Sequence, residues 1–422
     1  MSARPVFAAL RAVLVLVALA APALAAPPTG VSVVPVSLGA GEVTTHSINF
    51  TPSDLDRTES ITVTFPVGFD LTGSIAAVTT TMGGSTLSVS VAGQVVTVTR
   101  DNSGTQNINT ATGFTLSNIR NANLGSYVVT VSTTDDTPAA GAPAFTIVVG
   151  ATHHLAVSGI TDPIGAGVAS GVTVTAQDFF NNTTPAYTGT ITFTSSDGAA
   201  TLPANYAFVG GDAGVRSFPG GVTLVTTGVQ SVTATDTVTA SITGSQANID
   251  VTPGPAQTLS VTGITDPVGA GTASGVTVTA RDQFNNVATG YTGTITFSST
   301  DGAATLPANY AFVAGDMGVR SFPGGVTLRT AGVQSVTATD TVTGTITGTQ
   351  ANIDVTPGLA QTLSVTGITD PVTAGTASGV TVTARDQFNN VATGYTGTIT
   401  FSSTDGAATL PANYAFVAGD MG

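Results

Sequence analysis

The stretch from Gly171 to Ser196, GVTVTAQDFFNNTTPAYTGTITFTSS, decides the fold. In GVTVTAQD, Val172, Val174 and Ala176 alternate with threonines, and in TITFTSS the apolar residues are Ile191 and Phe193. A period of two, with one apolar and one hydroxyl face, is typical of half-buried antiparallel strands. The polar segment between the two runs contains Asn, Pro and Gly, which favour turns. The stretch therefore predicts two strands joined by a loop.

The same pattern recurs with a period of 104 residues. The motif GITD begins at Gly159, Gly263 and Gly367, and LPANYAF begins at Leu202, Leu306 and Leu410. The third copy differs from the second between residues 360 and 422 only at Thr373, which replaces Gly269. We expect that this copy is truncated, because the segment corresponding to Val319–Gly358 contains several strand-like runs. The expected domains are a signal peptide at 1–25, an N-terminal domain at 26–150, full repeats at 151–254 and 255–358, and a truncated repeat at 359–422.

Each full repeat is expected to be an immunoglobulin-like sandwich. Turn signals such as TDPIGAG, SSDGAA and FPGG separate about seven short alternating runs, a spacing typical of such sandwiches. Residues 27–150 lie outside the period but contain similar runs, so they predict a distinct N-terminal β-sandwich. The fold class is therefore all-β, with tandem repeats joined by linkers as short as TPGPA.

The segment SGVTVTARDQFNNVATGYTGTITFSSTDGAATL, Ser274 to Leu306, resembles bacterial immunoglobulin-like repeats of the invasin and intimin type. Those repeats share a strand, an Asp followed by a small turn that usually ends in Gly-Asn, and a second Thr- and Val-rich strand. Here Asn285-Asn286 stands at the turn, and Asn tolerates left-handed geometry. The resemblance covers about 152 to 422. It implies an adhesin stalk, in which a terminal domain usually binds the ligand.

The beginning of the chain is typical of an export signal. Arg4 and Arg11 precede the apolar run AVLVLVALAAPALA, and Ala23-Leu24-Ala25 fits the cleavage rule. No other segment is long and apolar enough to span a membrane. The chain has no Cys, so it has no disulfide framework. Its formal net charge of −14 makes nucleic acid an unfavourable partner.

Catalytic motifs are scarce, and we expect neither an enzyme nor a bound cofactor. The adjacent His153 and His154 should point to opposite faces of a strand, so they should not bind one metal together. GAGVASG, Gly165 to Gly171, is expected to be a turn. The Asp residues are expected to close turns. The alternative is calcium at the domain junctions, where Asp162 would approach Asp282, Asn285 and Asn286.

The leading hypothesis is a non-enzymatic, exported surface or secreted protein that serves as an adhesin stalk or adhesive array. Its partner would be a protein or carbohydrate on another surface, contacted through loops such as Asp178–Tyr187. The alternative is the spacer region of a larger secreted enzyme whose catalytic domain lies beyond residue 422. A third option is a surface-layer or matrix component that associates through its strand edges.

Overall fold

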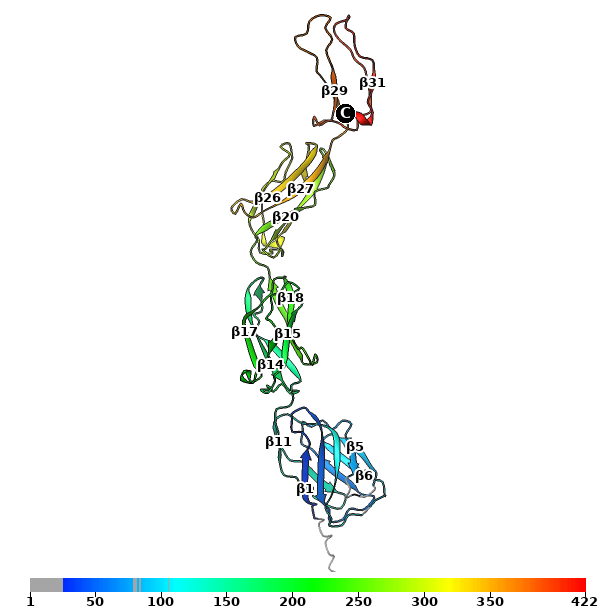
Figure 1. The fold of residues 1–422 in the computed structure, drawn as a ribbon, viewed down its shortest axis with the longest axis vertical. Coiled ribbons are helices and arrows are strands. Elements are labelled where there is room, and N and C mark those ends of the chain that lie inside the picture. Colours follow the sequence, from blue (N-terminus) through cyan, green and yellow to red (C-terminus); the bar gives the residue numbers. More distant parts are fainter. Residues whose placement is uncertain (1–25, 79–81, 83–84, 105) are drawn as a thin grey trace, which may run out of the picture.

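The computed structural model describes residues 26–78, 82, 85–104 and 106–422. The predicted signal peptide at 1–25 lies outside these residues. Figure 1 shows a row of β-sheet units along the long axis, with the N-terminal domain in blue to cyan at one end and the third copy in orange to red at the other. The described elements are strands and three-residue 3-10 helices. The predicted all-β fold is confirmed.

The N-terminal domain is a sandwich of two main sheets, with strand orders β1-β2-β7-β4 and β10-β9-β3-β6-β5, and a small pair β11-β8. Ile48 and Phe114 from the first sheet and Ile61 and Val98 from the second are fully buried in one core. The strands are β1 (Thr29–Pro35), β2 (Val43–Thr51), β3 (Ser60–Thr64), β4 (Ile75–Val78), β5 (Leu87–Ala92), β6 (Val95–Arg100), β7 (Thr112–Arg120), β8 (Gly125–Tyr127), β9 (Thr130–Thr133), β10 (Ala140–Gly141) and β11 (Phe145–Ile147).

The first full repeat folds into a three-stranded sheet, β12-β14-β17, and a five-stranded sheet, β13-β19-β18-β15-β16. All strand pairs are antiparallel except β13 with β19. This split of the first strand between the sheets confirms an immunoglobulin-like sandwich. The elements are β12 (His154–Ser158), β13 (Ile164–Gly165), β14 (Ala169–Gln177), β15 (Thr190–Ser195), β16 (Tyr206–Ala207), η2 (Gly210–Asp212), β17 (Val215–Thr223), β18 (Gly228–Asp236) and β19 (Thr243–Thr252).

The apolar positions of the opening stretch lie in the core, as their alternation predicts. Val174, Ala176 and Ile191 have no exposed surface. The second repeat has the same two sheets, β20-β22-β25 and β21-β27-β26-β23-β24. Its elements are β20 (Thr258–Thr262), β21 (Val268–Gly269), β22 (Ala273–Arg281), β23 (Thr294–Ser299), β24 (Tyr310–Ala311), η3 (Ala314–Asp316), β25 (Val319–Thr327), β26 (Gly332–Asp340) and β27 (Thr347–Thr356).

The third copy forms two separate strand pairs, β28-β29 and β30-β31. No strands equivalent to β25, β26 and β27 cover them among the described residues. Leu363 is therefore 44% exposed, whereas Leu259 at the same position of the second repeat is 5% exposed. The elements are β28 (Thr362–Thr366), β29 (Thr381–Arg385), β30 (Thr398–Ile399), β31 (Tyr414–Ala415) and η4 (Ala418–Asp420).

Candidate functional site at the junctions between domains

The predicted site residues Asp282, Asn285 and Asn286 form the turn that follows β22. The Asp282 carboxylate accepts hydrogen bonds from the backbone N–H groups of Phe284 and Asn286, both at 2.9 Å. Asn285 has a φ of +68°, the left-handed geometry that the sequence predicts for an Asn at this turn. An Asp that accepts from the backbone two residues ahead closes an Asx turn. The turn is thus built from local residues alone.

The same turn also binds the preceding repeat. The other Asp282 oxygen accepts from the Gly254 N–H in the linker, at 3.0 Å. The Asn286 side chain donates to the Val225 carbonyl at 2.7 Å and accepts from the Thr227 N–H at 3.2 Å. These bonds join one repeat, its linker and the next repeat. The junction is therefore a structured contact and not only a short linker.

The next junction repeats this arrangement 104 residues later. Asp386 accepts from the Gly358 N–H at 2.9 Å. Asn390 donates to the Arg329 carbonyl at 2.7 Å and accepts from the Ala331 N–H at 2.9 Å. The two junctions keep the same bonds although Arg329 and Ala331 replace Val225 and Thr227. The contact survives this change because it uses backbone groups of the preceding repeat.

The junction with the N-terminal domain is a variant of the same contact. Asp178 accepts from the Gly150 N–H at 3.1 Å, and Asn182 donates to the Asn123 side chain at 2.7 Å. The Arg120 guanidinium lies 4.4 Å from the centre of the Phe179 ring, a cation–π contact. Each described junction therefore uses an Asp and an Asn from the same turn.

A phenylalanine from each later repeat also packs on a glycine of the repeat before it. A Cβ at Gly167 would lie 2.4 Å from the Phe284 ring, and Gly167 has a φ of +82°. Gly271 has the same relation to Phe388. These positions require Gly for two reasons, the left-handed backbone and the approach of the ring. The sequence predicts a turn at Gly167 but not this contact, because the partner Phe284 lies more than a hundred residues away.

Hydrogen bonds keep the Asp282 carboxylate ionised. Burial by itself would raise the pKa of Asp282, but the bonds from the Asn286 side chain, the Gly254 N–H, and the Asn286 and Phe284 N–H groups lower it below its usual value. The donors around this carboxylate are N–H groups, and they use both oxygens. The charge is thus balanced by N–H dipoles of the turn and the linker.

The structure does not bring Asp162 into this set. Its carboxylate accepts from the Asp250 N–H at 2.9 Å, within the first repeat. Among residues 26–78, 82, 85–104 and 106–422, no group of three or more His, Asp or Glu side chains could hold a metal ion. Calcium at the junctions stays a prediction.

The structure bears on two other sequence expectations. His153 lies just before β12, so its side chain and that of His154 do not point to opposite faces of a strand. Their Nδ1 atoms lie 3.4 Å apart. The loop Asp178–Tyr187 is partly buried: Asp178, Thr184 and Tyr187 are 0%, 3% and 8% exposed, whereas Phe179 is 40% exposed. Ligand contact through this loop stays a prediction.

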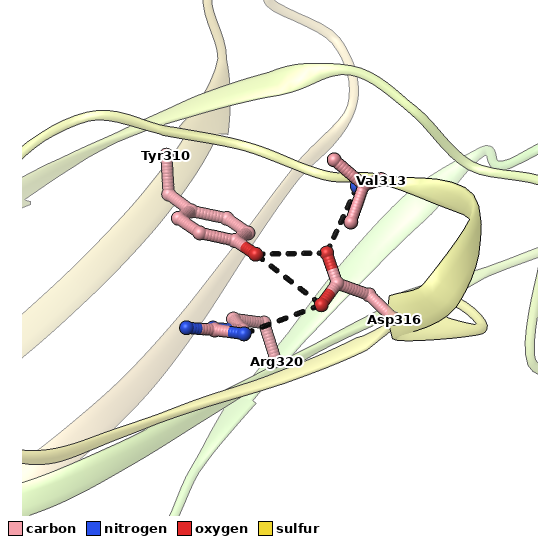
Figure 2. A network of polar contacts seen from close by, with 4 residues as sticks. All are labelled: Tyr310, Val313, Asp316 and Arg320. Carbon is pink, nitrogen blue, oxygen red and sulfur yellow. Dashed lines mark hydrogen bonds and ion pairs between the residues drawn. The ribbon is translucent and has the colours of Figure 1, made fainter.

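A second repeated feature lies beside β24 and β25 (Figure 2). Asp316 accepts from the Tyr310 hydroxyl at 3.0 Å and from the Val313 N–H at 2.9 Å. It forms an ion pair with Arg320 at 3.4 Å, and the Arg320 guanidinium lies 4.5 Å from the centre of the Tyr310 ring. Tyr206, Asp212 and Arg216 form the same network in the first repeat. The network was not predicted from the sequence, although its residues recur at constant spacing in YAFVxGDxGVR.

Several solved structures resemble this chain. The adhesin FdeC of Escherichia coli is 17% identical, and the match covers 78% of this chain and 99% of FdeC, with a TM-score of 0.29. Invasin, a bacterial integrin-binding protein, is 16% identical over 81% of this chain and 62% of invasin, with a TM-score of 0.27. The Yersinia pseudotuberculosis adhesin InvE is 19% identical over 48% of this chain and 58% of InvE, with a TM-score of 0.22.

No family model matches the chain, and no curated protein matches it. At these TM-scores the fold assignment rests on the strand pairing described above. In the part of the chain that the structure describes, no helix is long and apolar enough to cross a membrane.

Proposed function

We propose that this chain is a non-enzymatic, exported protein whose repeats form a stalk or adhesive array at a cell surface or in the surrounding medium. The observation that carries this proposal is the repeated junction. The same Asp, Asn and Phe–Gly contacts connect consecutive repeats. Because the same residues form each joint, every added copy extends the chain in a defined direction.

We expect the contacts at each joint to stiffen the chain. A short linker by itself leaves two domains free to swing about its ends. At the joint after the first repeat, Asn286 and Asp282 add four hydrogen bonds to the preceding repeat and linker. Each bond contributes roughly 0.5–1.5 kcal/mol to stability. Loss of all of them therefore destabilises the packed joint by a few kcal/mol at most. The Phe284 ring adds an apolar contact with Gly167 at the same joint, although this side chain stays 37% exposed.

Stiffness matters for both versions of the proposed role. A stalk must hold a binding domain away from the surface, and a flexible coil of the same length reaches less far. In an adhesive array, defined spacing lets weak contacts act together, which raises avidity without any stronger single contact. The ligand of such an array would be a protein or carbohydrate on another surface. The export part of the proposal is supported by the predicted signal at 1–25, and sequencing the mature N-terminus tests it, with Ala26 expected first.

Small-angle scattering of the full chain tests the stalk. The variant Asn182→Ala/Asn286→Ala/Asn390→Ala removes the junction amides, and we expect a smaller radius of gyration and a broader distribution of distances than in the parent. The matched control is Asn205→Ala/Asn309→Ala/Asn413→Ala. Its three amides are exposed, and one lies in each repeat. A junction variant that scatters like the parent and the control would show that these bonds do not set the stiffness.

A further inference from the structure

The strand β25 is a free edge of the second repeat. It pairs with β22 on one side, and on the other side the described residues provide only an isolated bridge between Thr305 and Thr327. The segment from Val319 to Phe322, which pairs in regular register with β22, therefore presents backbone N–H and C=O groups along an open edge. Such an edge is a template for pairing with another strand. The strand β17 has the same position in the first repeat.

Two residues of β25 oppose that pairing. Pro323 has no N–H to donate to a neighbouring strand. Arg320 lies opposite Val278, which is fully buried, so the Arg320 side chain leaves the strand on the side that faces the core. The next residue on that side, Phe322, lies opposite the buried Val276 and packs against the core. A charged group thus occupies the position at which an apolar residue would extend the core to the edge.

The Tyr–Asp–Arg network holds this guanidinium in place. Arg320 stacks on Tyr310 and pairs with Asp316, whose side chain is only 7% exposed, while the Arg320 side chain itself is 43% exposed. The Arg320 guanidinium therefore contacts Tyr310 and Asp316 on one side and water on the other. A strand that paired with β25 would remove that water from a charge whose single ion-pair partner lies at 3.4 Å, which is unfavourable.

We propose that Arg216 and Arg320 prevent the outer edge of each full repeat, β17 or β25, from pairing with a second copy of this chain. A second copy is the occupant that fits, because the repeats carry identical edge sequences, VRSFPGGVT. Two identical edges can pair antiparallel about a twofold axis, which is the simplest closed interface. Because pairing at these edges is blocked, the chains stay separate and do not associate side by side.

Sedimentation velocity over a wide concentration range tests this inference on the full chain. Arg216→Val/Arg320→Val replaces both guanidinium groups with a strand-forming apolar residue. We expect the weight-average mass to rise with concentration toward twice the parent value or beyond. Arg320→Val by itself should give a weaker rise. Arg320→Lys keeps a charge at the edge and should sediment like the parent.

The control variant is Arg57→Val, which removes one positive charge from an exposed turn in the N-terminal domain. It should not associate more than the parent. Circular dichroism checks that each variant keeps its sheet spectrum and cooperative melting. If the folded double variant kept the parent mass at every concentration, the inference about these edges would be wrong. It would also be wrong if Arg57→Val associated as strongly as Arg320→Val.

Discussion

The buried His46 predicts that acid destabilises the N-terminal domain. Its ring has no exposed surface and packs against Phe65, Phe69 and Phe145. Neither ring nitrogen has a hydrogen-bond partner among the described residues. Burial lowers the pKa of His46 from 6.5 to about 4. A proton therefore binds the unfolded chain more readily than the folded one between these values.

The sign and size of the effect follow from that difference. The contribution of His46 to stability is complete above pH 6.5 and is lost as the pH falls toward 4. A difference of about 2.5 pKa units corresponds to about 3 kcal/mol. For a domain of this size, that loss lowers the melting temperature by on the order of 10 °C.

Glu59 acts in the opposite direction, so the parent chain by itself is not a clean test. Burial raises the pKa of Glu59 to about 7, together with a hydrogen bond that the protonated Glu59 carboxyl donates to Asp135. Its folded carboxyl binds a proton first, so its contribution to stability increases as the pH falls from 7 toward 4.5. The measurement must therefore compare the parent with His46→Leu, in which the Glu59 effect cancels.

Calorimetry of both full chains at pH 7, 5.5 and 4 provides that comparison, and the transition that the substitution shifts belongs to the N-terminal domain. The stability of the parent relative to His46→Leu should fall by about 3 kcal/mol between pH 7 and pH 4. A relative stability that stays within about 0.5 kcal/mol over this range would refute the reasoning, because it would mean that water or a polar group solvates the folded ring.

Two more predictions follow from the repeats. Leu259→Ala should destabilise the second repeat by about 2–4 kcal/mol, whereas Leu363→Ala at the same position of the open third copy should cost less than about 1 kcal/mol; urea unfolding of both variants measures this, and equal losses would contradict the difference in burial. If the predicted calcium site at the junctions exists, millimolar calcium should raise the melting temperature of the parent, and Asp178→Asn/Asp282→Asn/Asp386→Asn should abolish that rise. An unchanged melting temperature in the parent would eliminate the site.

Much of each repeat could be predicted from the sequence because its signals are local. Val172, Val174 and Ala176 show their burial by alternation with their neighbours. The Asp282 turn is also local, since an Asp side chain that bonds to the backbone two residues ahead needs no distant partner. The period of 104 residues was visible because near-identical copies need no structure to be recognised.

The sequence by itself thus determined the strands, the turns, the repeat and the all-β class. Only the tertiary structure decided what these elements contact: that Phe284 packs on Gly167, that Arg320 closes a sheet edge, and that His46 lies unbonded among aromatic rings. The physical reason is range. A strand or an Asx turn is stabilised by neighbours within a few residues, whereas a buried charge, a glycine under a ring or an unpartnered imidazole is defined by atoms that folding brings from far along the chain.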